Sequence, residues 1–228
     1  MTKLALKYRP KYLLYWLMLI VATSCRDNEE IGNNSLPYLG YHATETIVVN
    51  GVEKDTIIKH RIPEFELKNQ YNENFGSEQL VDKNYLVEFF FTNCPSICPK
   101  VAKQMEDLHD KFKNEADFAL VSFTLYPKGD TVEKLFQFAE KKAVNNSNWF
   151  FLTGDKDEIY DLANEAYFVV ANNPNFEEDE DIMHKGVLVL VDMNGYIRGM
   201  YDGKDPATLK KVSQDLKLLR SQNLAMLN

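Results

Sequence analysis

A strongly apolar segment that runs into two cysteines places the tightest constraint on the fold of this chain. Residues 85–91 (YLVEFFF) are almost all apolar, as expected for a strand buried on both faces of a sheet. Cys94 and Cys98 follow this segment. Apolar residues then recur at the spacing of one helix face: Val101, Met105, Leu108 and Phe112. The sequence therefore predicts a strand that delivers two thiols to the first turn of a helix.

Two thiols at that position fit more than one chemistry. The N-terminal end of a helix dipole favours thiolate over thiol. Residues four apart on a helix share a face, roughly 6 Å apart, which allows either a disulfide or a shared soft metal ion. A purely structural disulfide would close a loop of only about five residues and would constrain the unfolded chain little. The spacing alone does not separate a redox-active disulfide of Cys94 and Cys98 from a metal site.

The order of the remaining elements predicts a thioredoxin-like α/β fold, because strands alternate with helices and the thiols lie at the first strand-to-helix junction. Before the cysteines we expect a β-hairpin at 46–58 that turns at Asn50-Gly51, a strand at 62–67 and a polar connection at 69–82. After them we expect strands at 117–125 and 149–152, helices at 130–139 and 155–167, a hairpin at 187–201 and a closing helix at 206–219. The N-terminal hairpin, and the C-terminal hairpin plus helix, extend the thioredoxin-like core.

The N-terminus has the pattern of an export signal. Residues 1–24 hold four basic and no acidic side chains, and the apolar run at 12–22 is shorter than the roughly 20 residues that span a bilayer. The run ends in Ala22-Thr23-Ser24-Cys25, which resembles the lipobox of bacterial lipoproteins, although an uncleaved anchor is the alternative. We therefore expect a signal peptide at 1–24, a lipid anchor on Cys25 with a flexible tether at 25–45, and a folded domain at 46–228. The expected location is the bacterial cell envelope, with the domain on the periplasmic, extracytoplasmic side of a membrane.

Charge narrows the range of partners. The formal net charge is −8, and loss of residues 1–24 would make the chain still more acidic. An acidic chain argues against nucleic acid as a partner and against electrostatic binding to anionic lipid. The acidic run at 177–181 is expected to be a solvated loop, with steering of a basic partner as the alternative.

Four histidines are candidates for a third ligand beside the thiols. Structural zinc sites need four ligands, and the chain has no second cysteine pair, whereas two thiolates and one imidazole suit copper. His42, His60 and His109 are expected to be solvated surface residues. His184 precedes the strand at 187, in the loop where thioredoxin-type oxidoreductases place a cis-proline beside their dithiol. This favours a metal carrier over a redox enzyme, with the neighbouring Met183 expected in the core.

These motifs together resemble the Sco (SenC) family of copper chaperones that serve cytochrome c oxidase assembly. The similar segments are FFFTNCPSICPKV around the cysteines, PKGDT at 127–131, FLTG at 151–154, Met183-His184 and YIRGMYDG at 196–203. The resemblance implies that Cys94 and Cys98 are thiolate ligands and that His184 is the imidazole ligand. Tyr126, Met183 and Lys185 depart from the family pattern at positions that surround the ligands.

The resemblance implies a membrane-anchored metallochaperone rather than an enzyme. Its cofactor would be copper, as Cu(I), Cu(II) or both, and its partner an apo cuproprotein such as the copper subunit of a respiratory oxidase. One alternative is a thiol–disulfide oxidoreductase that reduces the cysteines of such a client, with Cys94 as its nucleophile. A redox or copper sensor is the other. The sequence leaves the oligomeric state open.

Overall fold

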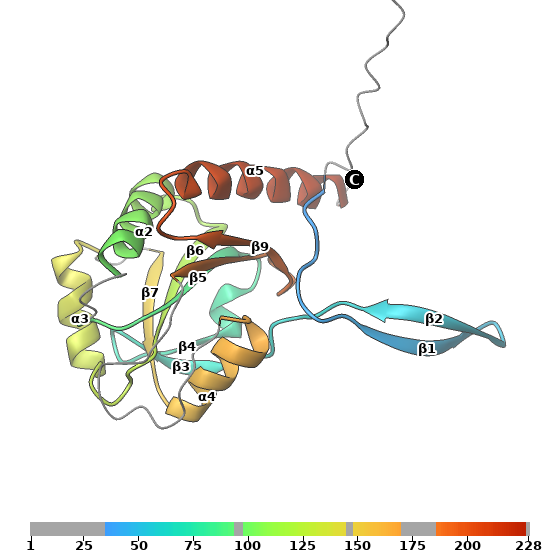
Figure 1. Ribbon diagram of the computed structural model, residues 1–228, viewed down its shortest axis with the longest axis horizontal. Coiled ribbons are helices and arrows are strands. Elements are labelled where there is room, and N and C mark those ends of the chain that lie inside the picture. The colour runs from blue at the N-terminus through green and yellow to red at the C-terminus, as the bar shows by residue number, and fades with distance from the viewer. Residues whose placement is uncertain (1–34, 94–97, 145–147, 170–185, 227–228) are drawn as a thin grey trace, which may run out of the picture. The chain divides into compact units, whose positions relative to one another are not determined.

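The computed structural model describes residues 35–93, 98–144, 148–169 and 186–226 (Figure 1). The described residues belong to one compact unit. The predictions of a signal peptide and of a lipid anchor on Cys25 therefore fall outside the described part of the chain. Within that part, no helix is both long enough and apolar enough to cross a bilayer.

A seven-stranded sheet in the order β4-β3-β7-β6-β5-β8-β9 forms the centre of the domain. Its strands are β3 (Glu66–Asn69), β4 (Asn74–Gly76), β5 (Asn84–Phe90), β6 (Phe118–Thr124), β7 (Trp149–Thr153), β8 (Val187–Val191) and β9 (Ile197–Asp202). Strand β5 is parallel to β6 and antiparallel to β8, and β6 is parallel to β7. The strand that leads to the cysteines is thus an inner strand, paired on both sides.

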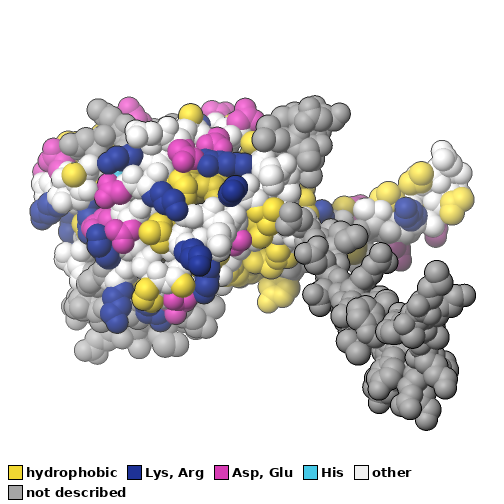
Figure 2. All heavy atoms as spheres, turned by 90° about the horizontal axis from the view of Figure 1, so that it is seen from above, with side chains coloured by type: hydrophobic (Ala, Val, Ile, Leu, Met, Phe, Trp, Pro, Cys, Tyr) yellow, Lys and Arg dark blue, Asp and Glu magenta, His cyan; other side chains and the backbone are white. Residues whose placement is uncertain are grey.

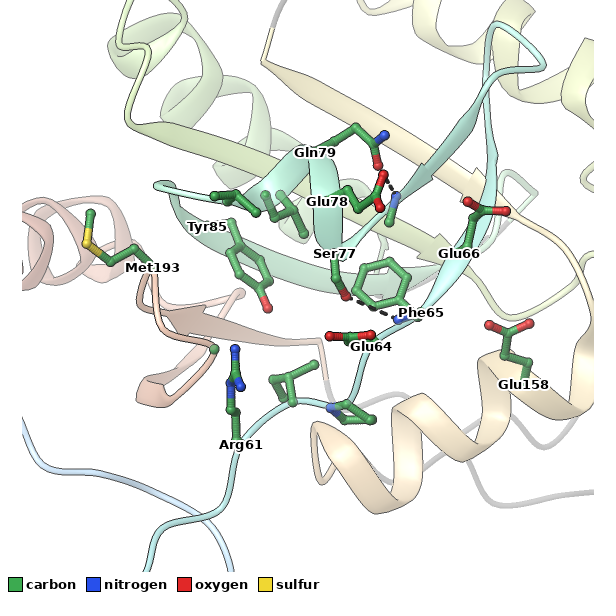
Figure 3. Close-up of a pocket in the computed structure, with 16 residues that line it drawn as sticks. Arg61, Glu64, Phe65, Glu66, Ser77, Glu78, Gln79, Tyr85, Glu158 and Met193 are labelled. Atoms are coloured by element: carbon green, nitrogen blue, oxygen red, sulfur yellow. Dashed lines mark hydrogen bonds between the residues drawn. The ribbon is translucent and has the colours of Figure 1, made fainter.

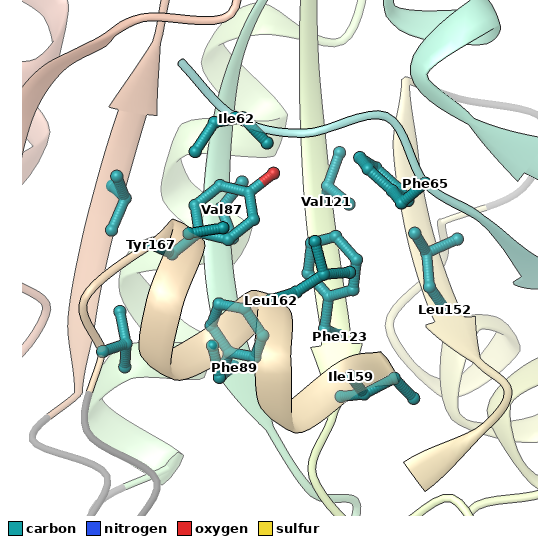
Figure 4. Close-up of a cluster of buried hydrophobic side chains, with 14 of the residues drawn as sticks. Ile62, Phe65, Val87, Phe89, Val121, Phe123, Leu152, Ile159, Leu162 and Tyr167 are labelled. Carbon is teal, nitrogen blue, oxygen red and sulfur yellow. The ribbon is translucent and has the colours of Figure 1, made fainter. Parts of the chain in front are cut away.

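Helices cover both faces of the sheet, which explains the continuous apolar sequence of β5. On one face, Leu86 and Phe90 pack in a cluster with α2 (Cys98–Phe112), α3 (Val132–Lys141) and α5 (Thr208–Met226). On the other face, β5 packs against α4 (Lys156–Asp161) and the π-helix at Leu162–Ala166 (Figure 4). The predicted helix at 155–167 therefore changes type midway, and the closing helix runs seven residues further than expected.

The N-terminal β-hairpin is confirmed. Strands β1 (Ala43–Val49) and β2 (Val52–Ile58) pair with each other and form a separate two-stranded sheet. The turn between them has positive φ at Asn50 (53°) and Gly51 (80°), which are the residue types that adopt this conformation most readily. The hairpin projects from the seven-stranded sheet in Figure 1, and several of its apolar side chains are exposed (Figure 2).

Two expectations for the segment before β5 are wrong. The strand predicted at 62–67 is confined to Glu66–Asn69, and the buried residues Ile62 and Phe65 lie in irregular chain before it. The polar connection predicted at 69–82 contains β4 and a 3₁₀ helix at Ser77–Leu80. These elements are too short to show a periodic apolar pattern, because each contributes only one or two buried side chains to the core.

The tether predicted through residue 45 is also wrong for residues 36–45. Leu39 N–H donates to the Ile197 carbonyl at 2.9 Å, and the Arg198 guanidinium donates to the carbonyls of Pro37 and Leu36 at 3.0 and 2.7 Å. Strand β1 then begins at Ala43. The partners of residues 36–39 lie about 160 positions later in the chain, so local composition does not reveal them.

Candidate metal centre

Of the three predicted ligands, only Cys98 lies within the described residues. Cys98 is the first residue of α2, as the sequence predicts. Cys94, Met183 and His184 fall outside the described residues. The geometry of this region is therefore defined by the residues on either side of them: Thr92 before Cys94, Val101 after Cys98, and Gly186 after His184.

The segment that leads to Cys94 is attached to a buried carboxylate. Asp130 is fully buried and accepts hydrogen bonds from Thr92 N–H at 2.9 Å and from the Thr92 hydroxyl at 2.5 Å. The Thr124 hydroxyl donates to the same carboxylate at 2.7 Å, and Lys134 Nζ lies 3.1 Å from it. Because β5 and β6 are parallel, Thr92 and Thr124 reach the same edge of the sheet, and Asp130 lies between them.

The segment that follows His184 meets the first turns of α2. Strand β8 runs antiparallel to β5, so it begins at the edge where β5 ends. Gly203 N–H donates to the Gly186 carbonyl at 2.7 Å. A Cβ atom on Gly203 would lie 2.7 Å from that carbonyl oxygen and 3.0 Å from Val101 Cγ1. Gly186 lies two positions after His184, and Val101 lies three positions after Cys98. Both are therefore close to Gly203.

Gly203→Ala tests this close approach. The new methyl group would overlap a backbone carbonyl and a buried valine, so the chain must shift where β8 and α2 meet. We expect a loss of about 1–3 kcal/mol in the free energy of unfolding, measured by urea denaturation. Gly51→Ala is the control for adding a methyl group alone, because a Cβ atom on Gly51 meets nothing within 4 Å and only its positive φ is unfavourable. A Gly203→Ala protein no less stable than the control would contradict the close contact.

The other histidines do not join this edge. His42 is exposed, and His60 Nε2–H donates to the Ala166 carbonyl at 2.8 Å. The expectation of a solvated His109 is wrong, because its side chain is buried on α2 with its ring centroid 5.6 Å from that of Trp149. Burial lowers the pKa of His109, so the neutral form is favoured there.

A second buried carboxyl lies under the helices on the α2 face of the sheet. Glu88 shares that face with Leu86 and Phe90, and its side chain accepts a hydrogen bond from the Ser122 hydroxyl at 2.6 Å. Trp149 Nε1 donates to the same hydroxyl at 2.8 Å. Burial raises the pKa of Glu88 to about 7, although Ser122 and Lys142 act in the opposite direction.

The pocket in Figure 3 lies at the opposite end of the sheet. It is lined by Tyr85 near the start of β5, by Arg61 and Glu64 from the chain before β3, and by Met193 and Gly195 of the β8–β9 turn. Tyr85 lies at the start of β5, whereas Cys94 follows the end of this strand in the sequence, so the pocket is at the end of β5 away from the cysteine segment. Over the described ranges, no three His, Cys, Asp or Glu side chains are grouped closely enough to hold a metal ion.

Sequence reasoning missed the role of Asp130. The Asp130-Thr131 pair indicates a helix start, and Thr131 does cap α3 by accepting from Lys134 N–H. An aspartate before a capping threonine gives no further signal of its own. Only the parallel pairing of β5 with β6 shows that this carboxylate faces the residues before Cys94.

Comparison with known proteins adds independent information. The family model described as SCO1/SenC matches residues 54–219. The "SCO1 protein homolog" of Bacillus subtilis (strain 168) is 30% identical over 162 residues, which cover 70% of this chain and 83% of that protein. A SCO1/SenC family lipoprotein from Bacillus anthracis str. Ames has a similar structure, with a TM-score of 0.64 and 29% identity over 71% of this chain and 95% of that one.

The structure of BsSco is also similar, with a TM-score of 0.62 and 28% identity over 71% of this chain and 94% of that chain. That protein is described as a member of the Sco family of cytochrome c oxidase assembly proteins, with an identified disulfide switch. The likeness of both structures to this chain confirms the predicted thioredoxin-like α/β fold.

Proposed function

Because this chain belongs to the SCO1/SenC family of copper-binding proteins of cytochrome c oxidase assembly, we propose that it is a copper chaperone. It binds copper through Cys94, Cys98 and His184 and passes the ion to an apo cuproprotein, such as the copper subunit of a respiratory oxidase. Cys25 is its lipid anchor, after removal of residues 1–24, and holds the domain on the extracytoplasmic side of a membrane. A lipoprotein among its structural relatives supports this part of the proposal.

The convergence of the segments that flank the three ligands is the main support for the copper site. Thr92, Val101 and Gly186 belong to three segments that end at the same edge of the sheet, and Val101 and Gly186 both approach Gly203. The antiparallel ladder of β5 and β8, continued in register, would bring the residues before Val187 alongside those after Phe89. Two thiolates and one imidazole on this edge form a donor set that suits copper.

The chemistry of transfer follows from these ligands. Copper requires both thiols in the deprotonated, reduced form, because a disulfide offers no thiolate to the metal. Cys98 is the first residue of α2, and the N-terminal end of a helix is an environment that favours thiolates in general. A three-coordinate ion leaves room for an incoming ligand from the client, so copper can move by stepwise ligand exchange.

A copper titration of wild type and His184→Ala tests the proposal. Residues 26–228, with both cysteines reduced, should bind about one Cu(I) per chain in competition with a chelator of known affinity. We expect His184→Ala to lower the affinity at least about tenfold, since even changes around metal ligands cost 10–100-fold. His42→Ala is the matched control, because His42 is exposed and lies before β1.

The same samples separate copper transfer from thiol chemistry. Thiol–disulfide exchange with a small dithiol should continue in His184→Ala, because both cysteines remain. If copper affinity does not depend on His184, the ligand set is wrong. If wild type binds copper only weakly and has a thioredoxin-like reduction potential, the protein is instead an oxidoreductase or a redox sensor.

A further inference from the structure

We propose that Asp130 is a positioning residue for the cysteine segment: by holding Thr92, it sets the reactivity and copper affinity of Cys94. The copper part rests on the function proposed above, whereas the effect on thiol chemistry does not. Asp130 itself is not a metal ligand in this proposal, because both of its carboxylate oxygens are engaged by groups of the protein.

Asp130 and Thr92 are joined by two hydrogen bonds. The backbone N–H of Thr92 donates to Oδ2 at 2.9 Å, and its hydroxyl donates to Oδ1 at 2.5 Å. Two bonds from one residue to one carboxylate fix both the peptide plane and the side-chain rotamer of Thr92, which a single bond would not do. Thr92 is two residues before Cys94, so the direction in which the chain enters the cysteine loop is defined there.

Asp130 is itself held rigidly. Its side chain is fully buried, and its N–H donates to the Tyr126 carbonyl at 2.8 Å. Thr124 at the end of β6 and Lys134 in the first turn of α3 contact the same carboxylate. Asp130 thus contacts β6, α3 and the segment after β5. The position of that segment therefore depends on the positions of β6 and α3.

The charge of Asp130 is compensated where it lies. A lone buried carboxylate near the cysteines would disfavour their thiolates. Lys134 Nζ, 3.1 Å from Oδ1, supplies a balancing positive charge, and three hydrogen-bond donors share the negative one. The carboxylate can therefore hold Thr92 without adding a large negative potential at the thiols.

Asp130→Asn would leave amide hydrogens facing buried hydrogen-bond donors, and we expect it to impair folding. Variants of the threonines that donate to Asp130 therefore give a sharper test. Thr92→Val removes the hydroxyl donor on the cysteine side, and Thr92→Ser retains it. Thr124→Val is the matched control, because it removes a hydroxyl donor to the same carboxylate from the β6 side. The purified full-length protein is used, with three measurements: the melting temperature, the Cu(I) affinity and the reduction potential of the Cys94–Cys98 pair.

We expect both valine variants to lower the melting temperature, Thr124→Val more, because Thr124 is fully buried and its hydroxyl also accepts from Tyr126 N–H at 3.0 Å. Thr92→Val alone should lower Cu(I) affinity about tenfold and shift the thiol–disulfide equilibrium by a similar factor, about 30 mV for a two-electron couple. Thr92→Ser should restore both values. Equal changes in the two valine variants, or no change in Thr92→Val, would overturn the proposal.

The two readouts also distinguish this proposal from the chaperone function. If wild type does not bind copper, the chaperone function fails, and the reduction potentials of the Thr92 variants still decide whether Asp130 positions the cysteine segment. If wild type binds copper and Thr92→Val changes neither readout, only the positioning role fails.

Discussion

Glu88→Gln is expected to stabilise the protein above neutral pH and to remove a pH dependence that wild type shows between about pH 4.5 and pH 7. Glu88 is buried in the inner strand β5, and burial raises its pKa from 4.5 to about 7. In this window the folded protein keeps the proton on Glu88, whereas the unfolded chain has released it. Because the folded state binds more protons, the free energy of unfolding falls as the pH rises.

The expected size follows from the shift in pKa. Each pH unit in the window changes the free energy of unfolding by about 1.4 kcal/mol, so wild type loses about 3 kcal/mol at Glu88 between its two pKa values. Below about pH 4.5 both states are protonated, and this contribution is fully present. The glutamine variant resembles the protonated acid in shape and hydrogen bonding, so wild type and variant should have similar stability at low pH and diverge as the pH rises.

Urea denaturation at several pH values between 4.5 and 8.5 measures this difference. Other carboxyl groups also titrate, so the quantity of interest is the wild-type value minus the variant value at each pH. Glu140→Gln on the exposed side of α3 is the control, and its difference from wild type should stay nearly constant. A flat difference for Glu88→Gln as well would mean that Glu88 titrates normally.

Arg198→Leu is expected to destabilise the domain by about 3–5 kcal/mol, because it leaves a buried carboxylate without its partner. Arg198 and Asp192 are 5% and 3% exposed, and Arg198 Nη1 lies 2.8 Å from Asp192 Oδ2. Three further guanidinium hydrogens donate to the Leu36 and Pro37 carbonyls and to Gln222 Oε1. The substitution therefore also removes two of the hydrogen bonds between the N-terminal segment and β9.

A surface arginine provides the comparison. Arg220 forms ion pairs with Asp117 and Glu115, but its side chain is 29% exposed, so Arg220→Leu should cost about 1 kcal/mol or less. Adding Asp192→Asn to Arg198→Leu should recover part of the loss, because the unpaired charge disappears. Denaturant unfolding measures all three variants. Equal losses for Arg198→Leu and Arg220→Leu would show that Asp192 does not depend on Arg198.

Local patterns in the sequence predicted the elements that form the site. The apolar run before Cys94 became β5, and the stripe from Val101 to Phe112 became the buried face of α2. The Asn50-Gly51 turn formed as predicted, because the preference of these residues for positive φ is a local property. The roles of Cys94, Cys98 and His184 as copper ligands remain predictions.

Long-range contacts account for what the sequence did not reveal. His109 was predicted at the surface, but it is next to the helix stripe and packs on Trp149, forty positions later. The flexible tether was predicted to extend through residue 45 because the local sequence does not show that residues 36–39 bind to β9. In the same way, Asp130 is significant only because Thr92, thirty-eight positions earlier, donates to it. Such pairings depend on topology rather than on local composition.

The attachment of residues 36–39 to β9 has a mechanical consequence. A pull on the chain from its N-terminal side enters the domain at these residues and passes to Ile197 and Arg198. Strand β9 is an edge strand of the sheet, and β8 separates it from β5. Arg198 also contacts Gln222 of α5, so the force spreads along the rim of the domain toward the other end of the chain. Such a load is therefore applied to a strand that is two positions away in the sheet from the strand that leads to the cysteines.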